Sequence, residues 1–272
     1  MYKQNEISQI VQQLDKALPL QRLVVGVQFL FNQETYTNYP CKNYTGKLSF
    51  CQMVRRAMDN ESYKYNFENF TCRCAAEALG LVEEMDCVAS GERYFATRLH
   101  ISRSVAKQVQ DSLLRIHHRV AGIVVGPLET LEAPDLSIIV CNTFDAMRII
   151  QGYAYVFGPP RNISTVGNQG FCCDLAARPY ETDDLNISFL CAGTRFKNDW
   201  ATDEVGIAMP INKFIPTARG VIQTLNPIEN RTRKQAVADR LSSPDELGIT
   251  IDYDENYGKN AAAYCTPGKL RR

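Results

Sequence analysis

Residues 121–126 read Ala-Gly-Ile-Val-Val-Gly, and residues 23–27 read Leu-Val-Val-Gly-Val. Each run combines β-branched residues with glycine, and Pro127 closes the run at 121–126. Short apolar runs that are bounded by turn residues are typical of buried strands. We therefore predict a strand over residues 23–31 and a central strand over residues 123–125.

Helical and strand-like patterns alternate along the remainder of the chain. The predicted helices span residues 4–17, 50–58, 75–79, 104–116, 143–151, 171–177 and 211–225. The other predicted strands span residues 94–99, 136–141, 186–191 and 205–209. We expect Gly152 to end the helix that begins at Thr143, and the helix that begins at Phe171 to stop before Pro179. The alternation predicts an α/β or α+β fold, with one or more mixed sheets flanked by helices.

The two apolar runs each precede a Phe-Cys element, at Phe50-Cys51 and at Phe171-Cys172. This similarity predicts two related halves, about 20–118 and 119–226, that arose by internal duplication. From Pro227 onward the chain becomes strongly polar. The predicted organisation is therefore an α/β domain over 1–226, followed by a polar C-terminal extension over 227–272.

Two cysteine pairs occupy equivalent places in these halves. Cys51 and Cys172 lie at predicted helix starts, and Cys72 and Cys191 each follow an Asn-apolar-hydroxyl sequence. Four thiols from two similar halves can surround one metal centre, either tetrahedral zinc or an iron–sulfur cluster. The four cysteines are therefore the candidate metal and cofactor ligands.

The cysteine spacing favours a cluster over zinc. Structural zinc sites usually draw on C-x-x-C-type knuckles, whereas this chain offers Cys72-Arg73-Cys74 and the adjacent pair Cys172-Cys173. Dispersed ligands are more readily tolerated by iron–sulfur clusters, so we expect a 4Fe–4S cluster on Cys51, Cys72, Cys172 and Cys191, with zinc as the second choice. Buried and metal-free cysteines are the alternative, because free cysteine packs as a small hydrophobe.

Polar residues near Cys191 suggest a chemical role beside the cluster. Small residues follow this cysteine up to Arg195, whose guanidinium can hold a carboxylate or a phosphate. Asp203 and Glu204 offer paired carboxylates in front of a predicted strand. We therefore assign candidate catalytic roles to Arg195, which would orient an anion, and to Glu204, which would move a proton.

Composition restricts the partners that we expect. Lysine plus arginine and aspartate plus glutamate number 30 each, so no global charge favours nucleic acid or anionic lipid. The chain shows neither a signal peptide nor a long uncharged apolar segment, so we expect a cytoplasmic protein that does not cross a membrane. Ten cysteines in a reducing compartment favour metal binding, catalysis or burial over disulfides. The expected partner is a small-molecule substrate or a redox protein, and homo-oligomers remain an open alternative.

Many separate motifs of the chain match one family pattern. They lie at residues 50–55, 68–72, 79–81, 90–94, 124–129, 134–135, 171–174, 186–188, 191–195 and 203–204. Together they resemble the uncharacterised family named domain of unknown function 169, or ArCR, over roughly residues 20–226. The resemblance implies that Cys51, Cys72, Cys172 and Cys191 act as a set, and it suggests a role in anaerobic metabolism. Cys74 and Cys173 are additions to that pattern.

Three functional hypotheses remain open from the sequence. The first is an oxygen-sensitive iron–sulfur protein with a redox or Lewis-acid role on a small molecule. The second is a metal-free module that binds a small molecule in a pocket lined by Tyr153, Tyr155 and Phe157. The third is a thiol redox protein that uses Cys72 with Cys74, or Cys172 with Cys173.

Overall fold

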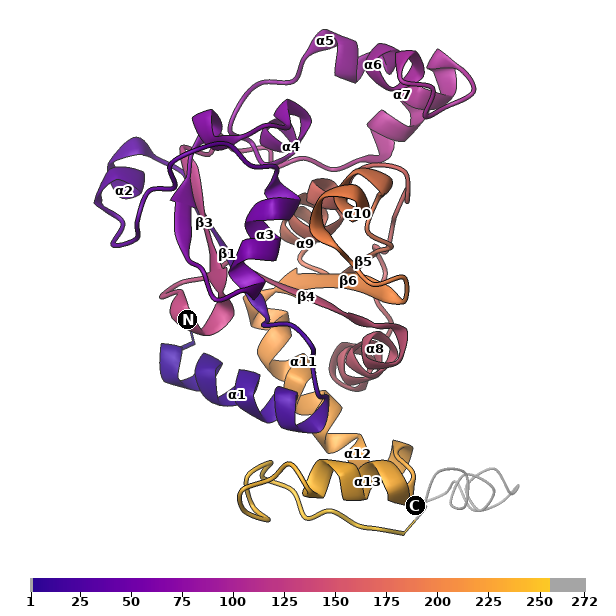
Figure 1. Ribbon diagram of the computed structural model, residues 1–272. Coiled ribbons are helices and arrows are strands. Elements are labelled where there is room, and N and C mark those ends of the chain that lie inside the picture. Colours follow the sequence, from indigo (N-terminus) through magenta and orange to yellow (C-terminus); the bar gives the residue numbers. More distant parts are fainter. Residues whose placement is uncertain (1, 255–272) are drawn as a thin grey trace, which may run out of the picture.

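The computed structural model describes residues 2–254 and contains one open sheet of six strands (Figure 1). The strands are β1 (Val25–Leu30), β2 (Tyr63–Tyr65), β3 (Gly122–Pro127), β4 (Leu136–Asn142), β5 (Asn186–Ser188) and β6 (Glu204–Pro210). They lie in the order β2-β3-β1-β4-β6-β5, and neighbouring strands are antiparallel. The predicted class of a sheet flanked by helices is confirmed, and the pairing within the sheet is antiparallel rather than mixed.

The two apolar runs that predicted central strands form β1 and β3. These strands are direct neighbours, and their register pairs Gly26 with Gly126. β1 also pairs with β4, so a strand from the proposed half 20–118 lies between two strands from the proposed half 119–226. The two proposed halves therefore contribute to a single sheet and do not form separate units.

Alternate residues of the central strands face two different cores. Ile138 and Val140 of β4 join a cluster with α3 (Phe50–Met58), α4 (Arg73–Ala78) and the helix over 171–182. Ile139 and Cys141 join a cluster with α1 (Gln4–Ala17), α8 (Thr143–Phe157) and α11 (Ile211–Gln223). The period of two along a strand produces this division, and Figure 1 shows the helical layers on both sides of the sheet.

Gly152 does not end its helix, because α8 continues to Phe157. A Cβ atom at Gly152 would lie 2.5 Å from Val221 Cγ2 and 2.6 Å from the Thr217 carbonyl oxygen on α11. The glycine therefore allows close packing between α8 and α11, and its role is tertiary rather than local. The prediction of a helix end at Gly152 was wrong for this reason.

The helix that begins at Phe171 also runs past its predicted end. A π turn over Cys173–Ala177 continues directly into α9 (Arg178–Thr182), in which Pro179 lies in the first turn. The N–H of Arg178 donates to the Cys173 carbonyl, five residues earlier. Pro179 has no N–H to donate to the preceding turn, and it lies where the helix changes from π to α hydrogen bonding. π turns are frequent at functional sites, and this one begins at a cysteine.

A small helical lobe lies at one end of the molecule (Figure 1). It contains α5 (Asp86–Ala89), α6 (Glu92–Ala96) and α7 (Arg103–Ser112). The strand predicted over 94–99 was wrong, because Gly91 adopts a φ of 75° and starts α6 in its place. Arg98 has a φ of 59°, which interrupts any extended conformation.

The C-terminal residues that the structure describes pack beneath α8 and α11. It consists of α12 (Leu225–Ile228) and α13 (Arg231–Ala238), and a buried ion pair of 2.7 Å joins Arg148 of α8 to Glu229. The remaining helices are α2 (Gln33–Asn38) and α10 (Ala192–Asn198). Part of the predicted extension, residues 255–272, lies outside the described residues. No helix between residues 2 and 254 has the length and hydropathy needed to cross a bilayer.

Candidate functional site

Four helix starts bring the predicted ligand cysteines to one cavity of about 440 Å³. Cys51 is the second residue of α3, and Cys172 is the second residue of the helix over 171–182. Cys72 immediately precedes α4, and Cys191 immediately precedes α10. We call this space the cysteine cavity. Its wall also includes Cys74 and Cys173, so six of the cysteines face the same space.

Local capping and aromatic packing fix these helix starts. Ser49 and Gln52 form a capping box at the start of α3, and Ser49 Oγ lies 3.1 Å from Cys51 Sγ. The rings of Phe50 and Phe171 pack with their centroids 6.0 Å apart. Because each phenylalanine directly precedes a cysteine, this contact brings Cys51 and the second Phe-Cys element to the same cavity.

The four predicted ligands form an electrostatic ring. A negative charge on Cys51 acts to raise the pKa of both Cys72 and Cys191. Charges on Cys72 and Cys191 in turn act to raise the pKa of Cys172. Each of the four thiols is therefore close enough to two others to affect their ionisation. Like charges gathered in this way favour a bound cation or cluster, which would relieve the repulsion.

The described residues contain no ready-made site for a single metal ion. Within residues 2–254, no three histidine, cysteine, aspartate or glutamate side chains are grouped closely enough to hold an ion. Tetrahedral zinc with Zn–S bonds of about 2.3 Å requires sulfurs about 4 Å apart. An iron–sulfur cluster places several irons and sulfides between its cysteine sulfurs, so its ligands stand farther apart than those of a single ion. The two kinds of centre therefore require different spacings of the ligand sulfurs.

Cys74 modifies the chemistry of Cys72. A hydrogen bond from Cys74 lowers the pKa of Cys72 to about 6, with smaller help from the positive charge of Lys197. The same hydrogen bond, together with burial, raises the pKa of the Cys74 thiol. Burial raises the pKa of Tyr94, which also hydrogen-bonds to Cys74. Cys72 is therefore the more acidic thiol of this pair, and Cys74 is the less acidic one.

Cys172 and Cys191 have less acidic thiols. The hydrogen bond to Cys173, followed by burial, raises the pKa of Cys172 well above its ordinary value. Burial raises the pKa of Cys191, although backbone N–H groups of Thr194 and Phe171 that donate to its sulfur oppose that shift. A bound cation would favour the ionised forms of Cys172 and Cys191, whose pKa values are raised in its absence.

A comparison with known proteins identifies the family of this chain. A family model described as DUF169, uncharacterised ArCR, matches residues 13–220. The chain belongs to the DUF169 family. No curated protein and no solved structure matches it significantly. The resemblance inferred from the motifs is confirmed, and the matched range contains all four ring cysteines.

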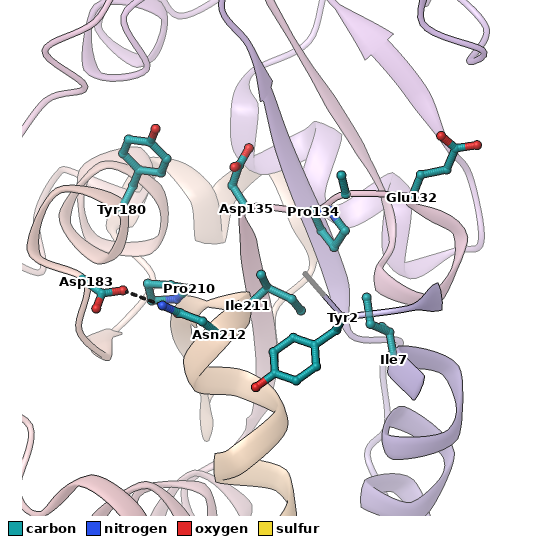
Figure 2. A pocket seen from close by; sticks show the side chains of 11 residues that line it. Tyr2, Ile7, Glu132, Pro134, Asp135, Tyr180, Asp183, Pro210, Ile211 and Asn212 are labelled. Carbon is teal, nitrogen blue, oxygen red and sulfur yellow. Dashed lines mark hydrogen bonds between the residues drawn. The ribbon is translucent and has the colours of Figure 1, made fainter. Parts of the chain in front are cut away.

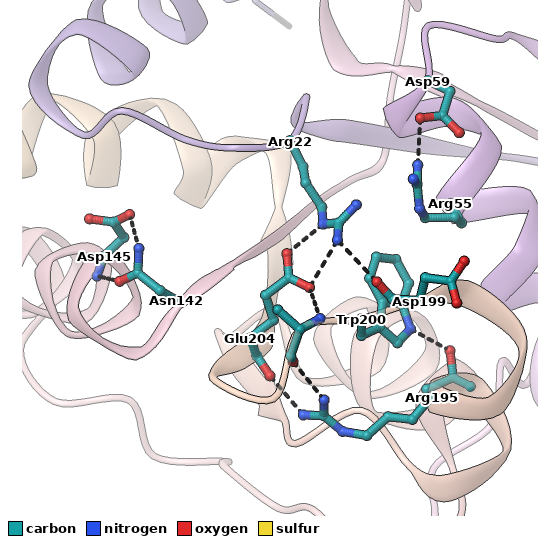
Figure 3. A network of polar contacts seen from close by, with 11 residues as sticks. Arg22, Arg55, Asp59, Asn142, Asp145, Arg195, Asp199, Trp200 and Glu204 are labelled. Atoms are coloured by element: carbon teal, nitrogen blue, oxygen red, sulfur yellow. Dashed lines mark hydrogen bonds and ion pairs between the residues drawn. The ribbon is translucent and has the colours of Figure 1, made fainter.

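The predicted catalytic residues of this DUF169 protein lie outside the wall of the cysteine cavity. Arg195 donates to the carbonyl oxygens of Phe189, Ala201 and Glu204 at 2.8–3.3 Å. The Glu204 carboxylate accepts from Arg22 at 2.5 and 3.0 Å and from the Ala201 N–H at 2.7 Å. Figure 3 shows this network beside Trp200, over whose ring Arg22 lies. These contacts hold the loop before β6 in place.

The cavity wall contains polar residues to which the sequence analysis gave no role. Arg93 and Tyr94 come from α6, Gln110 from α7, Gln169 from the loop before Phe171 and Lys197 from α10. A partial signal existed, because Arg93 and Tyr94 lie in a motif shared with the family and Gln169 lies in a glycine-rich loop. Gln110 and Lys197 gave no comparable signal in the sequence.

A second hollow, of about 560 Å³, lies beside the start of β4 and the end of β6, between residues of α1, α9 and α11 (Figure 2). Two of its carboxylates already have partners: Asp135 accepts from the Phe29 N–H at 2.7 Å, and Asp183 accepts from Asn212 at 3.2 Å. The aromatic residues proposed to line a pocket are on α8, and none of them lines either hollow. Tyr153 is buried there and donates to Asp184.

Proposed function

We propose that this DUF169 protein binds a 4Fe–4S cluster through Cys51, Cys72, Cys172 and Cys191. The observation that carries the proposal is the convergence of these four thiols, from four separate helix starts, on one cavity. Iron–sulfur clusters are held by cysteine thiolates. The four thiols that line one cavity would supply the thiolate ligands and the negative charge that a cluster requires.

The surrounding backbone is arranged to tune such a cluster. The N–H of Ala75 donates to the sulfur of Cys72, and the N–H groups of Thr194 and Phe171 donate to the sulfur of Cys191. Hydrogen bonds to the ligand sulfurs help to set the reduction potential of a cluster. When bound through all four cysteines, the cluster would supply one-electron transfer; a Lewis-acidic iron for a small molecule would require that one iron lacks a cysteine ligand.

The proposal also specifies a setting for this chemistry. We propose a cytoplasmic protein of anaerobic metabolism that acts on a small molecule or with a redox partner. All four ligands come from one chain, so the proposed centre does not require a second copy. The balanced charge of the chain provides no reason to expect nucleic acid as a partner.

The test is purification of the full chain without oxygen, followed by measurement of its visible spectrum, iron, zinc and acid-labile sulfide. We expect a brown protein with a broad visible absorption band and equal amounts of iron and sulfide. A colourless protein with stoichiometric zinc would contradict the proposal. A protein that stays free of metal after anaerobic reconstitution with iron and sulfide would contradict it as well.

A second candidate function is thiol–disulfide exchange, and the hydrogen bond between Cys74 and Cys72 favours it. The Cys72 sulfur would attack a substrate disulfide and release one thiolate, and Cys74 would then attack Cys72 and release the second. The products are a Cys72–Cys74 disulfide and a substrate reduced to two thiols. Mass spectrometry after incubation with oxidised glutathione should detect that disulfide in the metal-free protein. Its absence in wild type, or its persistence in Cys74→Ser, would contradict this function.

A further inference from the structure

Two buried side-chain amides in the wall of the cysteine cavity each have an NH₂ group without a hydrogen-bond partner. The side chains of Gln110 and Gln169 are only 4% and 6% exposed, and the Nε2 atom of each is buried without a partner. A buried donor without a partner costs about 1–3 kcal/mol, so folded proteins seldom retain one without a reason. The same wall holds buried acceptors without hydrogen-bond partners, both Glu77 carboxylate oxygens and Asn168 Oδ1, so a ligand of this cavity would meet donors at the two glutamines and acceptors elsewhere.

The orientation of Gln110 is fixed by its neighbour. Its Oε1 atom accepts a hydrogen bond from Arg115 Nη2 at 3.2 Å. An arginine side chain can only donate, so the amide oxygen must face Arg115 and the NH₂ group must face elsewhere. Arg115 is itself held by an ion pair with Glu84. The unpartnered donor of Gln110 is therefore a property of the fold and not of an arbitrary amide assignment.

Gln169 is held from the other side of the cavity. Its Oε1 atom lies 3.3 Å from His100 Nε2, and Asn168 donates to the Leu99 carbonyl at 3.2 Å. These contacts join the loop before Phe171 to the lobe that carries α6 and α7. The two glutamines thus approach the cavity from separate elements.

The cavity wall contains positively charged side chains, which suit a negatively charged ligand. Arg93 and Lys197 both line the wall, and neither has a carboxylate partner within residues 2–254. Their charges reach the cavity thiols, because Arg93 acts on Cys74 and Lys197 acts on Cys72. The only acidic residue of the wall is Glu77, which is buried and faces Arg73 at 3.4 Å. Apart from the thiols, the charged side chains of the wall are therefore mostly positive, and an anion would bind on the side of Arg93 and Lys197.

We propose that Arg93, Lys197, Gln110 and Gln169 bind a small molecule that bears an oxyanion, either a carboxylate or a phosphate, beside the four ring cysteines. The cavity volume of about 440 Å³ is within the range of small-molecule sites. Two amide donors and two cations match an acceptor-rich anionic group. The inference rests on the proposed function for what happens to the bound molecule, because the cluster would be the reacting group. The binding residues themselves are distinct from the cluster ligands.

Calorimetric titration of the anaerobically purified full chain tests this site, with malonate and inorganic phosphate as separate probes at millimolar concentration. We expect saturable binding of at least one probe, and the preferred probe distinguishes a carboxylate from a phosphate ligand. Gln169→Leu and Gln110→Leu should each weaken that binding by about tenfold, the effect of losing one hydrogen bond to a charged group. Gln108→Leu is the matched control, because Gln108 is exposed on the same helix as Gln110 and does not line the cavity.

Three further outcomes decide the proposal. Gln110→Glu keeps the side-chain shape but replaces the donor with an acceptor, so a folded variant must also lose binding. Cys191→Ser removes a cluster ligand, and retained probe binding in that variant would separate the anion site from the cluster. Failure of both probes to bind, or binding that neither glutamine substitution changes, would overturn the inference whether or not the protein contains a cluster.

Discussion

Two regions of the molecule are polar: the network of Arg22, Glu204 and Arg195, and the wall of the cysteine cavity. They differ in whether their hydrogen-bonding groups have partners within the protein. In the network, Arg195 donates to three backbone carbonyls, and the Glu204 carboxylate accepts from Arg22 and Ala201 (Figure 3). In the cavity wall, Gln110 and Gln169 retain buried donors without partners. A charged or polar residue type alone therefore does not indicate a binding site, and the proposed anion site rests on unmet hydrogen-bonding groups inside a cavity.

The volume of a cavity is also a poor indicator of a binding site. The hollow of Figure 2 is larger than the cysteine cavity, at about 560 Å³ against about 440 Å³. Its carboxylates at Asp135 and Asp183 already accept hydrogen bonds from the protein. The chemistry of the two walls distinguishes them better than their volumes do. Substitutions on each side should sharpen this contrast.

The largest effect is expected from the ring cysteines. Cys51→Ser, Cys72→Ser, Cys172→Ser and Cys191→Ser should each abolish most of the visible absorption and bound iron of the anaerobically purified protein, because each removes one thiolate ligand. Cys87→Ser is the matched control, since Cys87 is exposed and does not line the cavity. Equal iron content in the control and in all four variants would contradict the assignment of ligands.

The next largest effect concerns the satisfied network. Glu204→Ala should lower the free energy of unfolding by about 3 kcal/mol, because it leaves the largely buried Arg22 without its anion and the Ala201 N–H without its acceptor. Asp203→Ala is the control, and this exposed position should change stability by less than about 0.5 kcal/mol. Denaturant unfolding of both variants measures the difference. Similar values for the two would show that the network does not stabilise the fold.

A satisfied buried amide and an unsatisfied one can be compared directly. Asn186 is fully buried, donates to the carbonyls of Ser164 and Asp174 and accepts from the Ser164 N–H. Asn186→Leu should therefore cost about 3 kcal/mol, whereas Gln169→Leu should cost less than about 1 kcal/mol in the absence of ligand. Thermal or denaturant unfolding without added anions gives both values. A larger cost for Gln169→Leu would contradict the view that its donor awaits a ligand.

The smallest effect is a pH dependence in the hollow of Figure 2. Burial raises the pKa of Asp135 from 3.8 to about 6. The folded state therefore keeps a proton that the unfolded state has already released, and stability should fall as pH rises from about 4 to about 6. Asn cannot ionise, so Asp135→Asn should remove this pH dependence. Between about pH 4 and about pH 6, the free energy of unfolding of Asp135→Asn should therefore rise by about 1 kcal/mol relative to that of wild type, after allowance for partial exposure. A constant difference between pH 4 and pH 7 would contradict this assignment.

Helix and strand positions were largely predictable because they depend on local pattern. The apolar runs at 23–31 and 123–125 became β1 and β3, and the helix predicted over 50–58 spans those residues. The failures occurred where a distant contact determined the outcome. Gly152 packs against α11, so it lies within a helix that it was expected to end. The residues from Tyr94 to Leu99 have no neighbouring strand, so α6 forms near the start of that segment.

The sequence by itself predicted the fold class and the family and singled out four cysteines, because periodicity, motifs and spacing are written along the chain. Only the tertiary structure decided that those cysteines line one cavity, since four helix starts far apart in sequence must meet. It also separated Arg195, whose donors end on backbone carbonyls, from Arg93, whose charge faces the cavity. A side chain of either kind looks the same in a sequence. Its role depends on which groups remain without partners after the chain has packed, and packing is a property of three dimensions.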